Sequence, residues 1–481
     1  MKAHWTRPAL VALWSASLAF TVAAASDARP NIVIFIADDL TWHDVACFGG
    51  PTDAKTPQLD KLAREGVKLT QFFSPASVCS PTRQSLLTGI YPIRNGAYPN
   101  HSVVRPGTKT LPTHLATLGY RTACIGKTHF GPPECYPFDS MITMLGEASG
   151  DTSEDSGDGS LNLGSIKKFI RKDPSRPFCL YVATHEPHGP WTKGDRTAYD
   201  PAKLKLPPYL VDTDITRREL ANYLAEVSCL DQEVGEISNL LEQSGHTTDT
   251  LFLFFSEQGS SMPHGKWTCY DPGIHAAAIA RWPGNIKPGS ENPAMIQYVD
   301  ILPTLIEIAG GKPTEIDTGC ADATGNRQFD GNSFLPVLLG TTARHRDLVF
   351  AEHTARGISN GPEAYGTRAV RDERWKLIVN LEPEATFQNN MNRSSIVQSW
   401  RKKGNAGDSF ATEQVERYTK RPALELYDLS LDPWELYNIA SDPQNQDTIN
   451  RLRGSLDAWM HQQGDLGDPT EREAKKHQVK R

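Results

Sequence analysis

The feature that most constrains the fold is a set of uninterrupted apolar segments with helical patterns between them. Residues 31–36 (NIVIFI) are apolar almost throughout and rich in β-branched side chains, and residues 178–184 (FCLYVAT) and 251–255 (LFLFF) repeat this pattern. A strand that is apolar on both faces is typical of a parallel sheet covered by helices on both sides. Each segment ends in a polar cluster, and the carboxyl ends of parallel strands meet at one edge of the sheet. We therefore expect active-site residues to collect at that edge.

Helical patterns lie between these strands. Thr56 and Pro57 supply a cap and a proline at the first helical position, and Gly66 ends the helix. Thr216 and Glu219 form a capping-box pattern before a run of apolar residues at helical spacing. Strand, helix and strand in this order predict a large, mainly parallel sheet with helices on both faces.

The 481 residues exceed what one hydrophobic core usually serves, so we expect a large domain with a smaller companion. After about Arg344 the pattern changes to short alternating strands, as in residues 367–379, with a final helix near residues 448–460. We predict a catalytic α/β domain (residues 26–345), a small antiparallel sheet and helix domain (residues 346–468) and a charged, frayed tail (residues 469–481).

The first 25 residues are typical of an export signal. Lys2 and Arg7 give a basic start, residues 9–22 are mostly apolar, and three alanines from Ala23 offer a site for a signal peptidase. A membrane anchor is the alternative, but the apolar run is short and broken by serines, and no later segment approaches a membrane-spanning length. We expect an exported protein, periplasmic or secreted, without a membrane anchor.

Charge and cysteine spacing exclude several classes of protein. The net charge of -7 and the lack of a long block of lysine or arginine argue against a nucleic-acid partner. An anionic substrate must therefore be held by local basic residues. The eight cysteines are spaced neither as a zinc site nor as a small disulfide scaffold. Cys124 and Cys135 are a candidate bridge in an oxidising compartment, and buried free thiols are the alternative.

The sharpest local signal is the segment CSPTRQSLLTG, which begins at Cys79. Pro81 and Thr82 open a helix and Gly89 closes it, so Cys79 lies at a helix N-terminus. Unpaired amides and the helix dipole stabilise negative charge there, and Arg83, one turn on, adds a planar set of donors. A low-pKa thiol at a helix start and an inert core cysteine are the alternatives.

This segment resembles the signature of type I sulfatases, in which a dedicated enzyme oxidises the cysteine to formylglycine. Further segments similar to the family follow in the family's order over nearly the whole mature chain, and they include TPQLDKLAREG, RWPG, VDILPTLIEIAG and ELYDLSLDPWELYNIA. The resemblance implies an alkaline-phosphatase-like fold, with a large mixed, mainly parallel sheet sandwiched by helices and a small C-terminal antiparallel α+β domain.

The resemblance also implies a calcium site. Asp38 and Asp39, at the end of the first strand, match the paired aspartates that bind Ca²⁺ in sulfatases, and residue 79 would join them as a ligand. Glu257 and Gln258 stand where the family usually has Asp-Asn or Asp-His. Both side chains still offer the hard oxygen ligands that calcium prefers, with one more methylene. For an isolated Asp-Asp pair, a helix cap or solvated turn is the alternative.

Basic side chains match the family's sulfate site. Lys127 and His129, in GKTH, resemble the lysine and histidine that approach the sulfate and the formylglycine. His185, in THEPHGP, matches the histidine at the leaving-group side. Lys266, in HGKWTCYDPG, matches the lysine that comes before the family's tyrosine and acidic pair. We add two histidines that lie nearby in sequence, His188 and His264, as candidate substrate contacts. With Cys79 and Arg83, the residues Lys127, His129, His185 and Lys266 complete the catalytic set that the resemblance implies.

The resemblance implies a sulfatase that acts on sulfate esters or N-sulfates of a carbohydrate derived from a polysaccharide. TFQNNMNR together with ELYDLSLDP is similar to heparan N-sulfatase-like and polysaccharide-sulfatase members. The implied cofactors are Ca²⁺ and Cys79 converted to formylglycine (3-oxoalanine), and the implied partner is a formylglycine-generating or anaerobic sulfatase-maturing enzyme. A phosphomonoester or phosphonate hydrolase of the same superfamily and an inactive carbohydrate-binding homologue are the alternatives.

Overall fold

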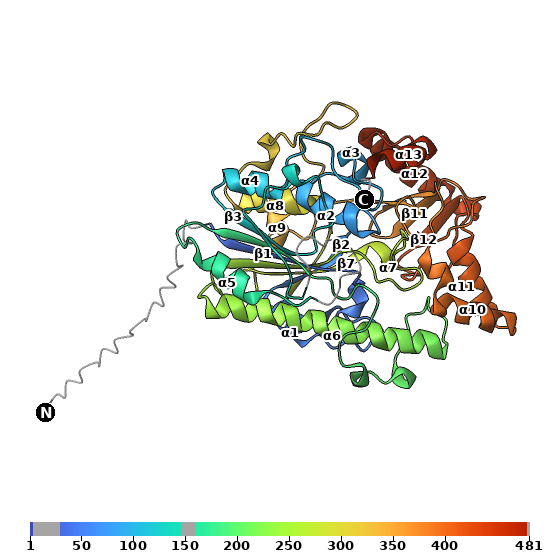
Figure 1. Ribbon diagram of the computed structural model, residues 1–481, viewed down its shortest axis with the longest axis horizontal. Helices are drawn as coiled ribbons and strands as arrows, with labels where there is room; N and C mark the ends of the chain where they lie inside the picture. Colours follow the sequence, from blue (N-terminus) through green and yellow to red (C-terminus); the bar gives the residue numbers. More distant parts are fainter. Residues whose placement is uncertain (3–28, 147–158, 479–481) are drawn as a thin grey trace.

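A computed structural model describes residues 1–2, 29–146 and 159–478, and its centre is a mixed sheet of eight strands within these ranges (Figure 1). The three apolar segments predicted as strands form β1, β5 and β6, which lie side by side and parallel at the centre of the sheet. Among the described strands of this sheet, only β7 runs antiparallel to its neighbours. In sheet order the strands are β4 (Ser140–Ile142), β3 (Arg121–Gly126), β5 (Phe178–Ala183), β1 (Asn31–Ala37), β6 (Thr250–Ser256), β7 (His275–Arg281), β2 (Val67–Phe73) and β8 (Ser290–Gln297).

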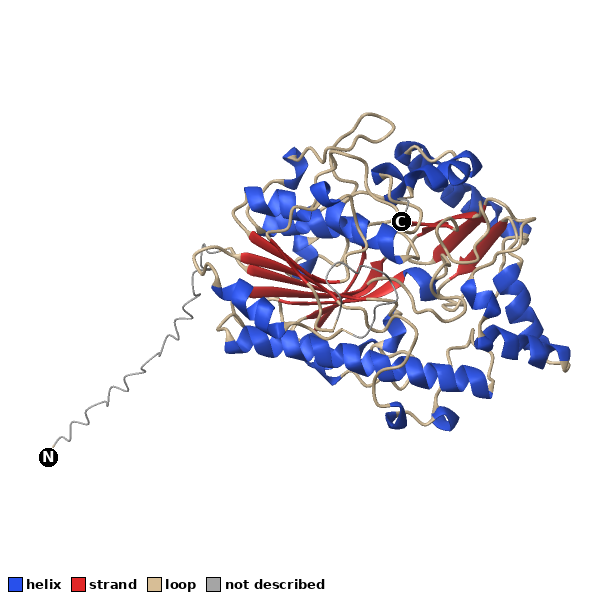
Figure 2. Cartoon of the chain, in the orientation of Figure 1, coloured by secondary structure: helices blue, strands red, loops and turns tan. Residues whose placement is uncertain are grey.

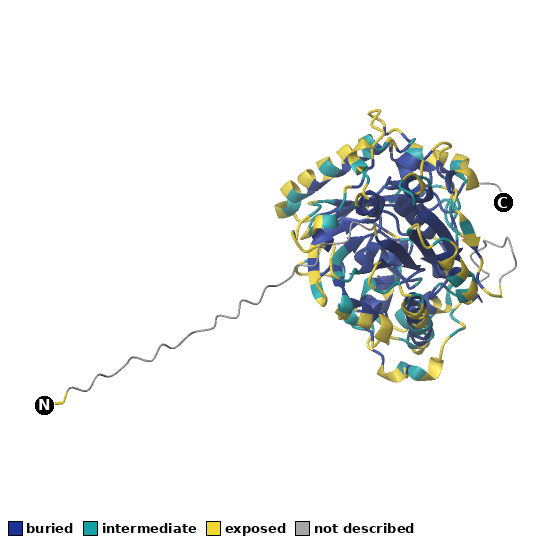
Figure 3. Ribbon diagram, turned by 90° about the vertical axis from the view of Figure 1, so that its left-hand side faces the viewer, coloured by how far each residue is buried: buried dark blue, intermediate teal, exposed yellow. Residues whose placement is uncertain are grey.

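Both faces of β1 are buried, which explains why its sequence has no polar residue between its ends. Ile32 and Ile34 pack on one face of the sheet and Val33 and Phe35 on the other, and all four are fully buried. Figure 3 shows the strands within the buried interior. Polar side chains that could form a site therefore lie at the ends of the strand. Helices α1 (Pro57–Glu65), α5 (Leu163–Arg171) and α6 (Asp214–Gln243) cover one face, and α2 (Cys79–Thr88), α4 (Leu111–Thr117) and α8 (Ile301–Ile308) cover the other (Figure 2).

The helix caps differ from those predicted. Helix α6 begins before the predicted capping box, because Thr213 is its N-cap and accepts a hydrogen bond from the Thr216 amide at 3.0 Å. Thr56 does not cap α1 with its side chain. Instead, the carboxylate of Asp231 on α6 accepts hydrogen bonds from the Leu59 amide at 2.8 Å and from the preceding amide at 3.0 Å. A residue distant in sequence thus satisfies the first turn of α1.

A second, antiparallel sheet lies at the other end of the molecule, as predicted, in the order β12-β11-β10-β9 (Figure 1). One face packs on α12, and the other contacts the connection between β6 and β7 through Cys269 and Tyr270. The elements are β9 (Val349–Thr354), β10 (Gly366–Arg371), β11 (Trp375–Asn380), β12 (Leu424–Asp428), α10 (Ser395–Asn405), α11 (Ser409–Thr419) and α12 (Gln446–Gln463). The remaining short α-helices are α3 (Pro92–Asn95), α7 (Asp271–Ile274), α9 (Leu335–Leu338) and α13 (Asp468–Glu473).

The C-terminal residues differ from the frayed tail that the charged composition predicts. Residues 468–477 are helical, and within them Glu471 is buried and accepts a hydrogen bond from Arg368 at 2.7 Å. Asp465, just before α13, also accepts from Arg368. Charged residues pack here because a buried arginine on β10 pairs with them.

Three further expectations concern export, membrane anchoring and disulfides. The predicted signal peptide, residues 1–25, lies outside the described residues except for its first two. Among the described helices, none has both the length and the apolar character needed to span a membrane. All eight cysteines are free, so Cys124 and Cys135 do not form the candidate bridge.

A buried ion network joins the two sheets beside the candidate site. Asp271, at the start of α7, contacts Arg371 at 2.5 Å and Lys376 at 2.8 Å, both from the small sheet. Lys376 also pairs with Glu435 at 2.9 Å. Burial opposes ionisation, but Arg371 and Lys376 hold the pKa of Asp271 well below its usual range. The network fixes α7 against the small sheet.

We expect Asp271→Asn to lower the free energy of unfolding by about 3 kcal/mol, because it leaves buried Arg371 without a carboxylate and Lys376 with Glu435 alone. Urea denaturation measures this loss. The difference from wild type is full above about pH 4 and shrinks as the pH falls, since protonation of Asp271 has the same effect as the substitution. The control is Asp347→Ala, which removes an exposed pair with Arg344 and costs under about 0.5 kcal/mol. Equal losses in the two variants would contradict the role of the network.

Candidate active site

Five segments bring polar side chains to one edge of the large sheet. β1, β3, β5 and β6 are parallel, and β2 runs in the same direction because it is antiparallel to β7. The predicted site residues follow the carboxyl ends of these strands, and all except His188 are at most 7% exposed. They are Asp38 and Asp39 after β1, Cys79 and Arg83 after β2, Lys127 and His129 after β3, His185 and His188 after β5, and Glu257, Gln258, His264 and Lys266 after β6.

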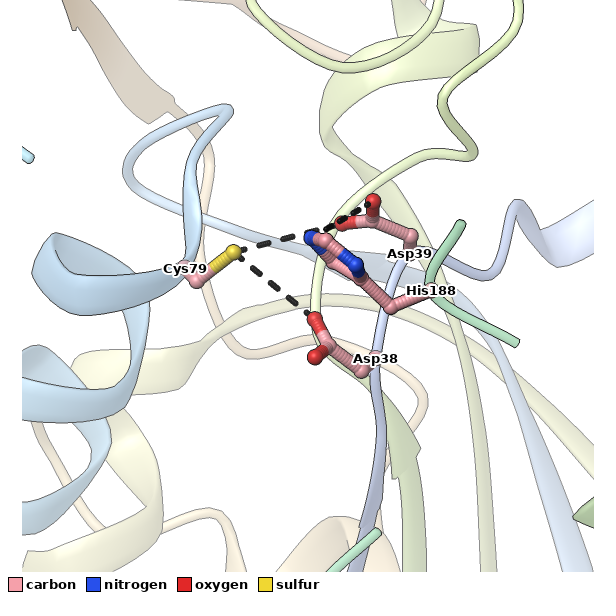
Figure 4. Close-up of side chains that lie close together, drawn as sticks. All are labelled: Asp38, Asp39, Cys79 and His188. Carbon is pink, nitrogen blue, oxygen red and sulfur yellow. Dashed lines mark hydrogen bonds and ion pairs between the residues drawn. The ribbon is translucent and has the colours of Figure 1, made fainter. Parts of the chain in front are cut away.

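The centre of this group is a cluster of four side chains (Figure 4). The Sγ atom of Cys79, at the first turn of α2, lies 3.7 Å from Asp38 Oδ1 and 4.0 Å from Asp39 Oδ1. His188 Nε2 lies 3.7 Å from Asp39 Oδ2. One ligand atom from each residue falls within 4.8 Å of the others. Two buried carboxylates thus face the residue that the sequence singles out.

Each aspartate also has its own lysine. Lys127 Nζ lies 2.5 Å from Asp38 Oδ2, and Lys266 Nζ lies 2.9 Å from Asp39 Oδ2. Ser261 donates a further hydrogen bond to Asp39. Although burial opposes ionisation, the positive charge of Lys127 holds the pKa of Asp38 well below its usual range. Asp38 is therefore a carboxylate near pH 7.

Glu257 binds Arg83 with both oxygens. Arg83 Nε and Nη2 each donate to one Glu257 oxygen at 2.9 Å, and both side chains are fully buried. Burial alone would lower the pKa of Arg83, but the Glu257 carboxylate raises it well above its usual value. The sequence predicts Glu257 as a metal ligand, whereas here its longer side chain forms a bidentate pair that fixes the guanidinium.

Gln258 completes the cluster from the side of β6. Its amide nitrogen contacts Asp39 Oδ1 and lies 3.8 Å from Cys79 Sγ. Its Oε1 atom is buried and has no hydrogen-bond donor among the described residues. A buried oxygen without a donor, next to two carboxylates, is the kind of donor set that a hard cation such as Ca²⁺ takes. The residues present therefore fit a calcium ion.

The histidines occupy different environments. Burial, reinforced by the charge of Lys127, lowers the pKa of His185 to about 4, so this side chain is neutral near pH 7. His129 Nε2 lies 3.0 Å from Nδ1 of a histidine that the motifs do not include, His101. His264 was predicted as a substrate contact, but it lies outside the cluster. Its ring is buried among aromatic rings, including those of Tyr418 and Tyr270.

Comparison with known proteins identifies the family. The model of the sulfatase family matches residues 30–311. The chain belongs to the sulfatase family. A second model, of the N-sulphoglucosamine sulphohydrolase C-terminal region, matches residues 263–389 of this sulfatase.

Two relatives extend over most of the sulfatase. It is 31% identical to an ulvan-active sulfatase of Formosa agariphila, over 92% of its own length and 82% of the relative's. It is 29% identical to human N-sulphoglucosamine sulphohydrolase, over 90% of both chains. These likenesses make the protein a sulfuric ester hydrolase.

Solved structures support the predicted alkaline-phosphatase-like fold. One is a protein in complex with its substrate D-glucosamine-2-N,6-O-disulfate, with a TM-score of 0.68, 20% identity and coverage of 92% of the sulfatase and all of that chain. Another is a phosphonate monoester hydrolase of Agrobacterium radiobacter, with a TM-score of 0.67, 19% identity and coverage of 90% and 96%. At this identity the likeness concerns the fold alone.

Two residues that the structure brings to the site of the sulfatase carry no recognisable sequence signal. Ser261 follows Gln258 within a polar loop, and a hydroxyl in such a loop has no distinctive spacing. His101 lies in the connection after α3, outside every segment that resembles the family. Tertiary structure alone places these two side chains.

We expect Glu257 and Gln258 to respond differently to substitution. Glu257→Gln should lower the free energy of unfolding by about 3 kcal/mol even with a chelator present, because Arg83 stays buried without its bidentate partner. Gln258→Ala removes a neutral group and should cost only about 1 kcal/mol under the same conditions. Urea denaturation of the two variants with and without Ca²⁺ measures both effects.

A calcium titration followed by calorimetry supplies the second half of this test. Gln258→Ala should weaken calcium binding about tenfold, as expected for the loss of one oxygen ligand that contributes about 1.4 kcal/mol. Equal stability losses in the two variants, or unchanged calcium affinity in Gln258→Ala, would contradict the division of roles.

Proposed function

We propose that this sulfatase hydrolyses sulfate groups of a sulfated carbohydrate, with Cys79 converted to formylglycine. The observation that carries the proposal is the position of residue 79, which lies at the start of α2 within 4.0 Å of both Asp38 and Asp39. Burial raises the pKa of the Cys79 thiol well above its usual value, although Lys127 lies nearby. An unmodified thiol here would remain protonated and unreactive. This argues against the low-pKa cysteine that is one alternative for this segment.

In this proposal Ca²⁺ is held by Asp38, Asp39, Gln258 and residue 79. The ion would supply positive charge against the oxygens of the sulfuryl group. Glu257 serves instead to fix Arg83, with its two hydrogen bonds of 2.9 Å. His188, 3.7 Å from Asp39, borders the same position and is a candidate substrate contact.

A hydrated aldehyde at position 79 would supply one hydroxyl to attack sulfur and a second whose deprotonation releases sulfate and restores the aldehyde. The chain's own residues prepare this chemistry. Arg83, Lys127 and Lys266 bind and orient the sulfate oxygens in a site shielded from water. His185 donates a proton to the leaving oxygen or nitrogen, and His129 moves protons at residue 79. In the protein without substrate, burial lowers the pKa of His185 to about 4. An anionic substrate beside this side chain would raise its pKa and favour the protonated form.

The substrate class follows from the relatives. Ulvan-active sulfatase and N-sulphoglucosamine sulphohydrolase are named for sulfated carbohydrates, and both are similar over most of the chain. We extend this class, as O-sulfate or N-sulfate, to the present protein. The proposal includes export through residues 1–25, maturation by a formylglycine-generating or anaerobic sulfatase-maturing enzyme, and a division into a catalytic part (residues 26–345) and a C-terminal part (residues 346–468).

Mass spectrometry of protein from its native host tests the modification. We expect the peptide with residue 79 to carry formylglycine and the peptide with buried Cys124 to keep its thiol. Cys79→Ser should fold normally and lose multiple turnover, because serine lacks the second hydroxyl. An intact thiol at residue 79 in active enzyme would rule out this mechanism, and an intact thiol in inactive protein would favour a carbohydrate-binding homologue.

Chelation tests the metal. Removing divalent cations should abolish turnover, and Ca²⁺ should restore it better than Mg²⁺, which demands a smaller octahedral site. Independently of activity, Ca²⁺ at 100 times its Kd should raise the free energy of unfolding by about 2.7 kcal/mol. Asp39→Asn should remove most of this stabilisation. A chelator that leaves both readouts unchanged would exclude a metal site at these residues.

Matched esters distinguish the sulfatase from a phosphonate or phosphate ester hydrolase of the same fold. We expect kcat/KM for a sulfated sugar to exceed that for the corresponding phosphorylated sugar by about a hundredfold or more, since each 1.4 kcal/mol of differential transition-state stabilisation gives a factor of ten. Unsulfated sugar is the binding control. A ratio below one would favour the phosphate or phosphonate ester hydrolase.

A further inference from the structure

We propose that His101 is a positioning residue that fixes the orientation of His129, and that Asn100 fixes His101 in turn. The inference rests on the proposed function, in which His129 moves protons at residue 79. His101 Nδ1 lies 3.0 Å from His129 Nε2, and the two ring centroids are 4.8 Å apart. Asn100 Nδ2 lies 3.1 Å from His101 Nε2. The three side chains therefore form a continuous hydrogen-bonded chain.

Asn100 and His129 contact opposite nitrogens of the His101 ring, Nε2 and Nδ1. These two contacts hold the ring in one orientation beside His129.

The backbone directs both histidines into this contact at a cost. His101 has a φ of 59° and His129 a φ of 47°, in the left-handed region that residues other than glycine rarely adopt. Such conformations are strained and persist where the surroundings enforce them. Two adjacent rings held this way point to a requirement for their geometry rather than to a chance contact.

The helix that carries Cys79 holds both histidine loops together. Gln84, on α2, donates to the Ser102 carbonyl at 2.9 Å, one residue after His101. The Oε1 atom of Gln84 accepts from the Val104 amide at 3.1 Å and from the Gly131 amide at 3.4 Å, two residues after His129. Val104 and Gly131 also share a backbone hydrogen bond of 2.9 Å. The same helix, α2, therefore carries residue 79 and holds the two loops that contain His101 and His129.

The C-terminal segment supports the far end of the chain. Gln478 donates from its side chain to the Asn100 carbonyl at 3.1 Å, and it pairs with Ser102 in a β-bridge. The loop that contains His101 is thus held on one side by α2 and on the other by the last described residue. This explains why a segment so rich in charge packs against the catalytic part.

Kinetics of His101 variants in the mature enzyme, with formylglycine verified by mass spectrometry, test the proposal. We expect His101→Ala to lower kcat about 10- to 100-fold on a sulfated sugar while KM stays within about twofold, as is usual for residues that support a catalytic group. His101→Gln, which keeps a hydrogen-bonding group near His129, should recover most of kcat. The matched control is His246→Ala, since His246 also lies beside an asparagine, Asn31, but at the opposite end of β1.

A double-mutant cycle separates positioning from an independent role. In a His129→Ala background, His101→Ala should cause less than about a twofold further loss, because the residue that it positions is already gone. Losses that multiply, an unchanged kcat in His101→Ala, or a raised KM with unchanged kcat would each overturn the proposal. The last result would make His101 a direct substrate contact.

A crystal structure of His101→Ala tests the inference without turnover. We expect the His129 ring to rotate or to occupy more than one orientation while the backbone of α2 stays in place. A His129 ring unchanged in position would overturn the proposal. If the wild-type protein fails to hydrolyse sulfate esters, the proposed function fails, and this structural result still decides whether His101 positions His129.

Discussion

The site depends on the burial of two adjacent carboxylates at the end of β1, a fully buried strand. Asp38 and Asp39 are both fully buried, and an unpaired charge in such a place would cost several kcal/mol. Lys127 and Lys266, each within 3 Å of one aspartate, make the pair tolerable. Parallel strands whose carboxyl ends meet at one edge supply these partners from distant parts of the sequence. Sheet topology and charge compensation are therefore aspects of one constraint.

The balance of charges at the site gives a physical reason for a cation. The buried acids are Asp38, Asp39 and Glu257, and the buried bases beside them are Arg83, Lys127 and Lys266. Since Gln258 is neutral and His185 is uncharged at its low pKa, the protein groups nearly cancel. Among the described residues, the site therefore has no excess of positive charge to attract a sulfate ester. A divalent cation at the aspartates would supply that attraction, which is a physical reason for a sulfatase built this way to require one.

Much of this could be predicted from sequence because the signals are local. The strand at residues 31–36, the helix that starts at Cys79 and the aspartates after β1 all follow from short patterns. The side chains that contact these groups from distant parts of the sequence could not be predicted from short patterns. The cap of α1 comes from Asp231, and the bidentate use of Glu257 depends on where Arg83 lies across the edge. Charged composition was misleading at the C-terminus, because its pairing with Arg368 is invisible to pattern.

A series of contacts links the C-terminal segment to the active site. Arg368, on the small sheet, pairs with Asp465 and Glu471 and so anchors the segment that ends near Gln478. Gln478 in turn holds the backbone of Asn100, from which the histidine chain runs to His129. Asp271 fixes the opposite side, five residues after Lys266. The small sheet therefore contributes to the active site through the elements that it holds in place.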